Sequence, residues 1–387
     1  MNRRRLAPLL LVLAAAGARA AEPERVVSGR TLVSVTAPAV RIQVPEAFRY
    51  AGGQRFVLYD VADAEQHLFV DADASGLVRR LYWLQFESYL PGKGGTYRYE
   101  GETAAIGPLA FVSNQAARST TAVPRAGSDG ARIRELLADK KLRLPPAMLW
   151  QRLVHLPDEG KRRELMILYM EAAASEKTAL DGLLQRATDG LRLSWLLLEP
   201  DAPELNARAP DAFNVALETS KGRVLLEVHR PWSPHGVDRF FNLVRAGYYD
   251  GVRFHRTVKG RWTQFGIHGD PRVSQAWRAR AIPDDPRMES NTRGTLAFAF
   301  AVPNGRTTQV FFNPVDNSAT HDKEPFVPFA RVVGGLDVLD ALYSEYGESS
   351  GGGIRAGKQG PLFEQGSTYL DREFPKLDRI VTATVVP

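Results

Sequence analysis

Cysteine is absent from the 387 residues of this sequence. A chain without thiols cannot form disulfides, bind a metal through cysteine, use a thiol nucleophile or carry a lipid on an N-terminal cysteine. The seven histidines show no spacing that is typical of a metal site. The sequence therefore predicts no metal site.

An apolar run long enough to cross a membrane is also missing from the N-terminus. Three arginines at positions 3–5 precede an apolar run, residues 6–16, which is too short to span a bilayer. The run leads into the small-x-small sequence ARA, which ends at Ala20. This order indicates a signal peptide, residues 1–20. We expect export into a bacterial periplasm and no stable membrane insertion after the signal is cleaved.

Strong net charge is missing as well, although the formal value for the whole chain is +6. Four of the 50 basic residues belong to the predicted signal peptide, which leaves 46 basic residues against 44 acidic ones. This near balance gives no reason to expect nucleic acid or an anionic membrane as a partner. Apolar residues make up 44% of the chain, and its length allows two globular domains.

The first domain, predicted at residues 21–198, begins with strands and ends with helices. Between residues 26 and 114, short alternating segments separated by turn signals indicate an antiparallel sheet. After residue 128, helical spacing predicts helices in ARIRELLADKK, in PPAMLWQRLVHL and in the segment that follows Pro157. We expect an α+β domain. Nothing in it indicates chemistry, so its role and its partner stay unknown.

A segment with three prolines and no periodicity, residues 199–211, is predicted to be a linker. The second domain follows at residues 212–387. It begins with a strand pair at 214–231 and a helix that starts at Pro234, and further short strands continue to DRIVTATVV. Short, mostly antiparallel strands with two helices predict a mainly β domain, a closed barrel with two capping helices.

One arginine of the second domain lies in an unusual position within VRFHRTVKGRWTQFGIHGDP. Val252, Phe254 and Arg256 alternate with other residues, so a strand would turn the arginine to the same side as two apolar residues. That position is costly for a cation unless its N–H donors are used. The donors could serve a nearby carboxylate in a buried ion pair, or they could serve a ligand.

An ordered series of segments surrounds this arginine and fills the rest of the domain. It comprises KGRVLLEVHRPWSPHGVDRFFNLVRAGYYDGVRFHRTVKGRWTQFGIHGDP, then RGTLAFA, TTQVFFN and VPFARVVGGLDVLDAL. In this series, residues 212–386 resemble the cyclophilin family of peptidyl-prolyl cis-trans isomerases. They are most similar to bacterial members with a glycine-rich insert, here residues 347–360, before YLDREFPKLD. The resemblance implies a cyclophilin-like barrel and an enzyme that acts on proline-containing polypeptides without a cofactor.

The resemblance also implies roles for single residues. It makes Arg256 the catalytic residue and Gln264 the residue that orients it. It implies substrate binding by the following residues: Phe254, Trp262, Ala299, Gln309, Phe311, His321 and Phe326.

Three positions depart from the family pattern. Where the family has an aromatic wall residue after glycine, this chain has Arg261, followed by Trp262. Phe300 stands where many members have asparagine, and Phe326 stands where the family has histidine. Arg261 either turns to solvent and leaves Trp262 as the wall of the proline pocket, or it brings a second cation into the pocket and prevents proline binding.

The implied chemistry needs only positioned hydrogen-bond donors and apolar walls. An X–Pro bond rotates over a barrier of roughly 18–20 kcal/mol because twisting breaks amide resonance. The twisted imide nitrogen gains a lone pair, and an arginine N–H aimed at it binds the transition state more tightly than the planar ground state. We expect a peptidyl-prolyl cis-trans isomerase that assists the folding of exported proteins. Two alternatives stay open: a weak or inactive module that binds peptides in the same groove, and an interaction protein whose N-terminal domain recruits a partner.

Overall fold

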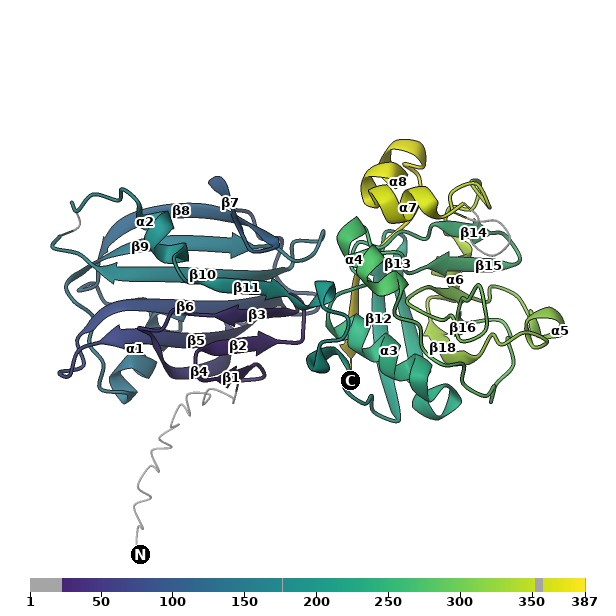
Figure 1. Ribbon diagram of the computed structural model, residues 1–387, viewed down its shortest axis with the longest axis horizontal. Coiled ribbons are helices and arrows are strands. Elements are labelled where there is room, and N and C mark those ends of the chain that lie inside the picture. Colours follow the sequence, from purple (N-terminus) through teal and green to yellow (C-terminus); the bar gives the residue numbers. More distant parts are fainter. Residues whose placement is uncertain (1–22, 176, 352–357, 387) are drawn as a thin grey trace, which may run out of the picture.

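The computed structural model describes residues 23–175, 177–351 and 358–386. The predicted signal peptide, residues 1–20, lies outside this part of the chain. The described residues form two domains that lie side by side (Figure 1). No helix in these ranges is long and apolar enough to cross a membrane.

Two antiparallel sheets build the N-terminal domain. The larger sheet has the strand order β4-β5-β6-β10-β9-β8-β7, and the smaller has the order β1-β2-β3-β11. The strands are β1 (Val26–Ser28), β2 (Thr31–Ser34), β3 (Val40–Gln43), β4 (Arg49–Leu58), β5 (Ala62–Ala72), β6 (Val78–Tyr89), β7 (Glu102–Ile106), β8 (Leu109–Ser119), β9 (Ala147–His155), β10 (Arg163–Ala172) and β11 (Arg192–Trp195).

Apolar clusters lie on both faces of the larger sheet, and the central strands β5, β6, β9 and β10 are buried on both sides. The small sheet and helix α2 (Leu183–Thr188) cover one face, where Ile42 and Leu183 join the same apolar cluster as Tyr82. Helix α1 (Asp129–Asp139) covers the other face with Ile133 and Leu137.

The N-terminal domain is therefore mainly β, and the predicted α+β fold is wrong in this respect. The first of the three predicted helices is confirmed as α1, but AMLWQRLVH forms β9 and the segment after Pro157 leads into β10. Met148 and Leu149 of β9 are 0% and 2% exposed and belong to opposite apolar clusters. A strand buried on both faces has a nearly continuous apolar run, which periodicity does not distinguish from a buried helix.

An eight-stranded antiparallel sheet forms the C-terminal domain, in the order β14-β15-β17-β16-β18-β13-β12-β19. Its strands are β12 (Ala212–Thr219), β13 (Gly222–His229), β14 (Arg256–Val258), β15 (Trp262–Phe265), β16 (Thr295–Phe298), β17 (Val310–Phe312), β18 (Pro328–Gly334) and β19 (Ile380–Val386). The backbone N–H of Phe254 donates to the carbonyl oxygen of Asp378 at 2.9 Å, so the segments beside the two edge strands meet. Between the described parts of β14 and β19 there is no strand ladder. The sheet is thus a curled half-barrel and not the predicted closed barrel.

The predicted helix that starts at Pro234 is confirmed as α3 (Pro234–Arg245), which buries Val237, Phe240 and Leu243 in the core. Five shorter helices complete the described part of the domain, more than the two that the sequence predicted. They are α4 (Pro271–Arg278), α5 (Ser318–His321), α6 (Leu336–Asp340), α7 (Gly360–Gln365) and α8 (Ser367–Glu373).

The segment predicted to be a linker, residues 199–211, packs onto the C-terminal core. Ala202, Leu205 and Ala209 are buried in the same apolar cluster as helix α3. The turns η1 (Leu196–Leu198) and η2 (Pro203–Leu205) shape this stretch, and η3 (Arg230–Trp232) follows β13. The connection between the domains is therefore held in place along its length.

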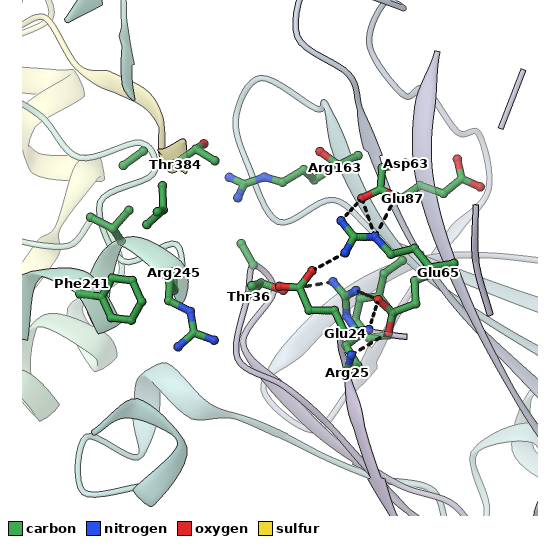
Figure 2. A pocket seen from close by; sticks show the side chains of 17 residues that line it. Glu24, Arg25, Thr36, Asp63, Glu65, Glu87, Arg163, Phe241, Arg245 and Thr384 are labelled. Carbon is green, nitrogen blue, oxygen red and sulfur yellow. Dashed lines mark hydrogen bonds and ion pairs between the residues drawn. The ribbon is translucent and has the colours of Figure 1, made fainter. Parts of the chain in front are cut away.

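Ion pairs join the two domains. Arg163 of β10 pairs with Asp250, and Glu159 pairs with both Arg253 and Arg379 of the C-terminal domain. A cleft of about 440 Å³ lies between the domains, walled by N-terminal strands on one side and by α3 and β19 on the other (Figure 2).

Candidate active site

A groove of about 580 Å³ lies on the C-terminal domain. It is lined by the ends of β14, β15, β16 and β17, by helices α4, α5 and α7, and by the loops beside them. All but one of the predicted site residues line it, namely Arg256, Gln264, Trp262, Ala299, Gln309, Phe311, His321 and Phe326.

Strand register places three of these residues in a row. Arg256 of β14 is the cross-strand partner of Gln264 of β15, and Gln264 is the partner of Phe311 of β17. Directly opposed residues of an antiparallel pair lie on the same face of the sheet, so all three side chains point to one side. The Oε1 atom of Gln264 accepts a hydrogen bond from Nη1 of Arg256 at 3.1 Å.

Arg256 also forms an ion pair, which was one of the two uses that the sequence left open for its donors. Its Nε and Nη2 atoms donate to the two carboxylate oxygens of Glu348 at 2.9 and 2.8 Å. The ring of Trp262 lies under the guanidinium, 4.5 Å from Cζ to the ring centroid. The arginine side chain is 19% exposed and still lines the groove.

Aromatic side chains from separate segments form the apolar wall. The ring of Phe311 lies 5.2 Å from that of Phe326 and 5.4 Å from that of His321, measured between centroids. Trp262 stacks near His321 at 6.0 Å, and Phe300 contacts Phe326 at 4.6 Å. The two phenylalanines that depart from the family pattern therefore extend this wall.

Amide side chains form the polar rim. Nε2 of Gln264 donates to Oε1 of Gln309 at 2.8 Å, and Nε2 of Gln309 donates to Oε1 of Gln359 at 3.0 Å. The backbone N–H of Ala299 donates to the carbonyl oxygen of Gln309 at 2.9 Å, which holds the strand edge beside the groove. The rim thus orders the amide groups that border Arg256.

One predicted substrate-binding residue lies elsewhere. Phe254 is 1% exposed and packs in the domain core, 5.4 Å from the ring of Phe265. Strand β14 begins only at Arg256, so the alternation that the sequence predicted from Val252 onward does not extend to Phe254. The structure therefore does not bring Phe254 to the groove.

Arg261 takes the first of the two positions that the sequence left open. It is exposed and is not among the residues that line the groove, whereas the neighbouring Trp262 lines it. The second cation near the proline pocket therefore turns away from it.

Histidines near the groove are held in their neutral form. Burial, together with the nearby charge of Arg256, lowers the pKa of His255 to about 3. Burial also lowers the pKa of His321, which lines the groove. Among the described residues, no group of three or more potential ligands could hold a metal ion. Three charged side chains line the groove, Arg256, Arg278 and Glu324, and of these Arg256 lies over the ring of Trp262 and bonds Gln264.

Several groove residues, and the partner of Arg256, were not predicted from the sequence. Glu348 lies 92 positions after Arg256, in an insert whose sequence shows no periodicity. Three further residues line the groove: Arg278 of helix α4, Phe363 of helix α7, and Gln359, which precedes α7. The only available signal was the glycine-rich insert itself.

The arrangement can bind a proline and stabilise its rotation. Apolar rings around Phe311 can hold the pyrrolidine, while Gln264 and Gln309 can bond to the peptide backbone. A guanidinium N–H beside this wall can donate to the imide nitrogen when twisting gives it a lone pair. No proton transfer or covalent intermediate is needed. These features define an active site that acts on X–Pro peptide bonds.

Comparison with known proteins agrees with this class. A sequence profile described as cyclophilin type peptidyl-prolyl cis-trans isomerase/CLD matches residues 214–355. Peptidyl-prolyl cis-trans isomerase cyp18 of Streptomyces antibioticus is 33% identical over 135 residues, which cover 33% of this chain and 81% of the relative. Peptidyl-prolyl cis-trans isomerase B of Escherichia coli is 28% identical over 180 residues, 44% of this chain and 98% of the relative.

A crystal structure of a cyclophilin-type isomerase of Cryptosporidium parvum covers 46% of this chain and 98% of its own, at 18% identity and a TM-score of 0.34. The profile and the sequence relatives show the family. The chain belongs to the cyclophilin-type peptidyl-prolyl cis-trans isomerases, and its C-terminal domain carries this activity.

Proposed function

We propose that the protein is exported and that it catalyses X–Pro rotation in other exported proteins, which assists their folding. One observation carries the choice of substrate: the guanidinium of Arg256, the amide of Gln264 and the ring of Phe311 line one groove of about 580 Å³. The apolar rings and the amide groups that line the groove suit a segment of a polypeptide that contains proline.

The proposed location rests on the sequence. The arginines at 3–5, the apolar run at 6–16 and the ARA sequence that ends at Ala20 have the order of a signal peptide. The absence of cysteine fits an oxidising compartment, in which a free thiol would be at risk.

Two measurements test this function. Expression of the full chain in a bacterium, followed by fractionation and N-terminal sequencing, should give a periplasmic protein that begins at Ala21. The mature protein should accelerate the refolding of a protein whose slow phase is proline isomerisation, and Arg256→Ala should abolish the acceleration. A protein that stays in the cytoplasm with residues 1–20 attached would contradict the location; equal refolding rates with and without the protein would contradict the role.

A second candidate function is peptide binding with little turnover. The ion pair between Arg256 and Glu348 favours it, because a paired guanidinium interacts less strongly with a new acceptor. Phe300 and Phe326 also replace polar residues of the family pattern with an apolar surface. Titration of an X–Pro peptide separates the candidates: tight binding without any acceleration of isomerisation would favour the module, and rapid exchange between bound isomers would favour the enzyme.

Recruitment of a partner by the N-terminal domain, residues 21–198, stays a prediction.

A further inference from the structure

We propose that Glu348 is a positioning residue for isomerisation: it holds Arg256 in the orientation that catalysis requires. The proposal rests on the isomerase activity of the groove and adds Glu348, which lies in the described first part of the glycine-rich insert, to the active site.

The ion pair between Arg256 and Glu348 is bidentate. Both carboxylate oxygens of Glu348 accept hydrogen bonds, one from Nε and one from Nη2 of Arg256, at 2.9 and 2.8 Å. Parallel bonds of this kind fix the plane and the direction of a guanidinium, which a single charge would not do. Gln264 holds Nη1 at 3.1 Å, and Trp262 supports one face of the group. The guanidinium is thus held at two nitrogens by Glu348, at the third by Gln264 and on one face by Trp262.

Donors remain for the substrate. A guanidinium has five N–H groups, and the bonds to Glu348 and Gln264 use three of them. One N–H on Nη1 and one on Nη2 have no protein acceptor in the part of the chain that the structure describes. These are the donors available to an imide nitrogen in the groove.

The position of the carboxylate distinguishes holding from blocking. Arg256 lines the groove, whereas Glu348 is not among its lining residues. A carboxylate that occupied the substrate site would border the cavity. Glu348 instead binds the arginine edge outside the groove and leaves the groove open.

The backbone on both sides of Glu348 is anchored. Before it, the ring of Tyr346 contacts Tyr343 and Phe374 at centroid distances of 4.9 and 5.1 Å. After it, Ser350 is 1% exposed, and a Cβ on Gly351 would lie 2.9 Å from Cδ2 of His255. The close approach of Gly351 seats the insert directly against the start of β14, which carries Arg256.

The far end of the insert reaches the same site. Gln359 is 3% exposed; its Nε2 donates to the carbonyl oxygen of Gly351 at 3.1 Å, and its Oε1 accepts from Gln309. Gln309 in turn bonds Gln264, the second partner of Arg256. Hydrogen bonds therefore link both ends of the insert to the arginine, and Gln359 acts as an indirect support.

The test compares single substitutions in the mature full-length protein, with kcat and KM measured for isomerisation of a short X–Pro peptide. Glu348→Ala should lower kcat about tenfold and change KM by less than about twofold, because the donors remain but lose their fixed direction. Glu348→Gln keeps one acceptor oxygen on a side chain of the same length. Its kcat should lie between those of the wild type and Glu348→Ala. The matched control is Glu345→Ala, since Glu345 is exposed and has no hydrogen bond or ion pair within the described residues. It should match wild type.

A second readout reports the arginine directly. The Nε–H resonance of Arg256 should be protected from solvent exchange in the wild type and lose that protection in Glu348→Ala. This measurement remains informative if Glu348→Ala lowers the thermal stability of the protein. In that case Glu348→Gln should stay folded and still lose part of the Nε–H protection.

Each contrary result has a defined meaning. A kcat that is unchanged or higher in Glu348→Ala overturns the proposal, and so does a loss confined to KM or an Nε–H signal that stays protected. If the wild type is no faster than Arg256→Ala, the isomerase function itself is overturned. A third outcome separates the two claims. If the wild type and Glu348→Ala have the same kcat and Arg256→Ala is much slower, the isomerase function stands and only the proposed role of Glu348 is overturned.

Discussion

Arg256 in the groove and Arg55 in the cleft between the domains have almost the same hydrogen bonds. In each, Nε and Nη2 donate to one carboxylate, Glu348 for Arg256 and Asp63 for Arg55, and Nη1 donates to a further acceptor. For Arg55 that acceptor is a second carboxylate, Glu24, whereas Arg256 has a neutral amide. Figure 2 shows the two acids that accept from Arg55, Asp63 and Glu24, among the residues that line the cleft.

The surroundings of the two arginines differ more than their bonds. Arg55 lies among Arg25, Glu65 and other charged residues, and its hydrogen bond to Asp63 raises its pKa. Arg256 lies over the Trp262 ring and beside an aromatic wall, with one carboxylate partner. A bidentate ion pair therefore neither marks an arginine as structural nor excludes it from catalysis. Both arginines keep one unbonded N–H on Nη1 and one on Nη2 within the described residues, and what distinguishes Arg256 is the aromatic wall beside these donors.

The largest effect should come from removing the groove arginine. Arg256→Ala should lower kcat/KM for an X–Pro peptide by about 100- to 1,000-fold, the range for loss of one preorganised donor at a developing charge. Arg55→Ala is the matched control and should leave kcat/KM within about twofold, because Arg55 lies outside the groove. A comparable loss in both variants would break the distinction between the two arginines.

Lowering the pH should reduce the stability that comes from the charged residues of the cleft more than it affects the groove. Burial would raise the pKa of Glu65, but the hydrogen bond from His67 and the charge of Arg25 lower it from 4.5 to about 2. Because the folded value is depressed, the stabilisation is complete above pH 4.5 and is lost as the pH falls towards 2. Linkage gives a loss on the order of 3 kcal/mol in the free energy of unfolding.

Urea unfolding of the wild type and of Glu65→Gln over this pH range measures the effect. The variant should be less stable near neutral pH and should show a flatter dependence. Parallel curves for the two proteins would mean that Glu65 does not hold its charge in the folded domain.

A moderate effect should follow from removing the neutral acceptor. Gln264→Ala should lower kcat/KM about tenfold, because it takes away one bond to the guanidinium and one possible bond to the substrate backbone. Thermal unfolding should be recorded alongside, since Gln264 is 5% exposed. Full activity in a folded variant would show that Glu348 alone orients the arginine.

The smallest effect should come from the exposed neighbour. Arg261→Ala should change kcat/KM by less than about twofold, because its charge lies outside the groove and is screened by solvent. An increase of tenfold or more would show that Arg261 hinders proline binding.

The sequence predicted the C-terminal domain better than the N-terminal one. The ordered segments around Arg256 gave the fold family and most of the groove, because residues such as Gln264 and Phe311 are local motif positions brought together by strand register. The helices predicted after residue 140 were wrong because β9 and β10 are buried on both faces. Apolar runs of that kind carry no reliable period.

Long-range partners escaped prediction for a different reason. Glu348 meets Arg256 across 92 positions, and a single carboxylate in a glycine-rich insert has no pattern that names its partner. The family resemblance placed Phe254 in the groove, but the strand begins only at Arg256 and Phe254 packs in the core. Both cases depend on where the backbone turns, which is decided by tertiary packing.

A crystal structure of the protein with a bound X–Pro peptide tests the central claim most directly. We predict the proline ring against Phe311, an Nη atom of Arg256 within hydrogen-bonding distance of the imide nitrogen, and Glu348 still bonded to Nε and Nη2. A peptide that displaces Glu348 from the arginine, or a proline ring bound away from Phe311, would contradict the account.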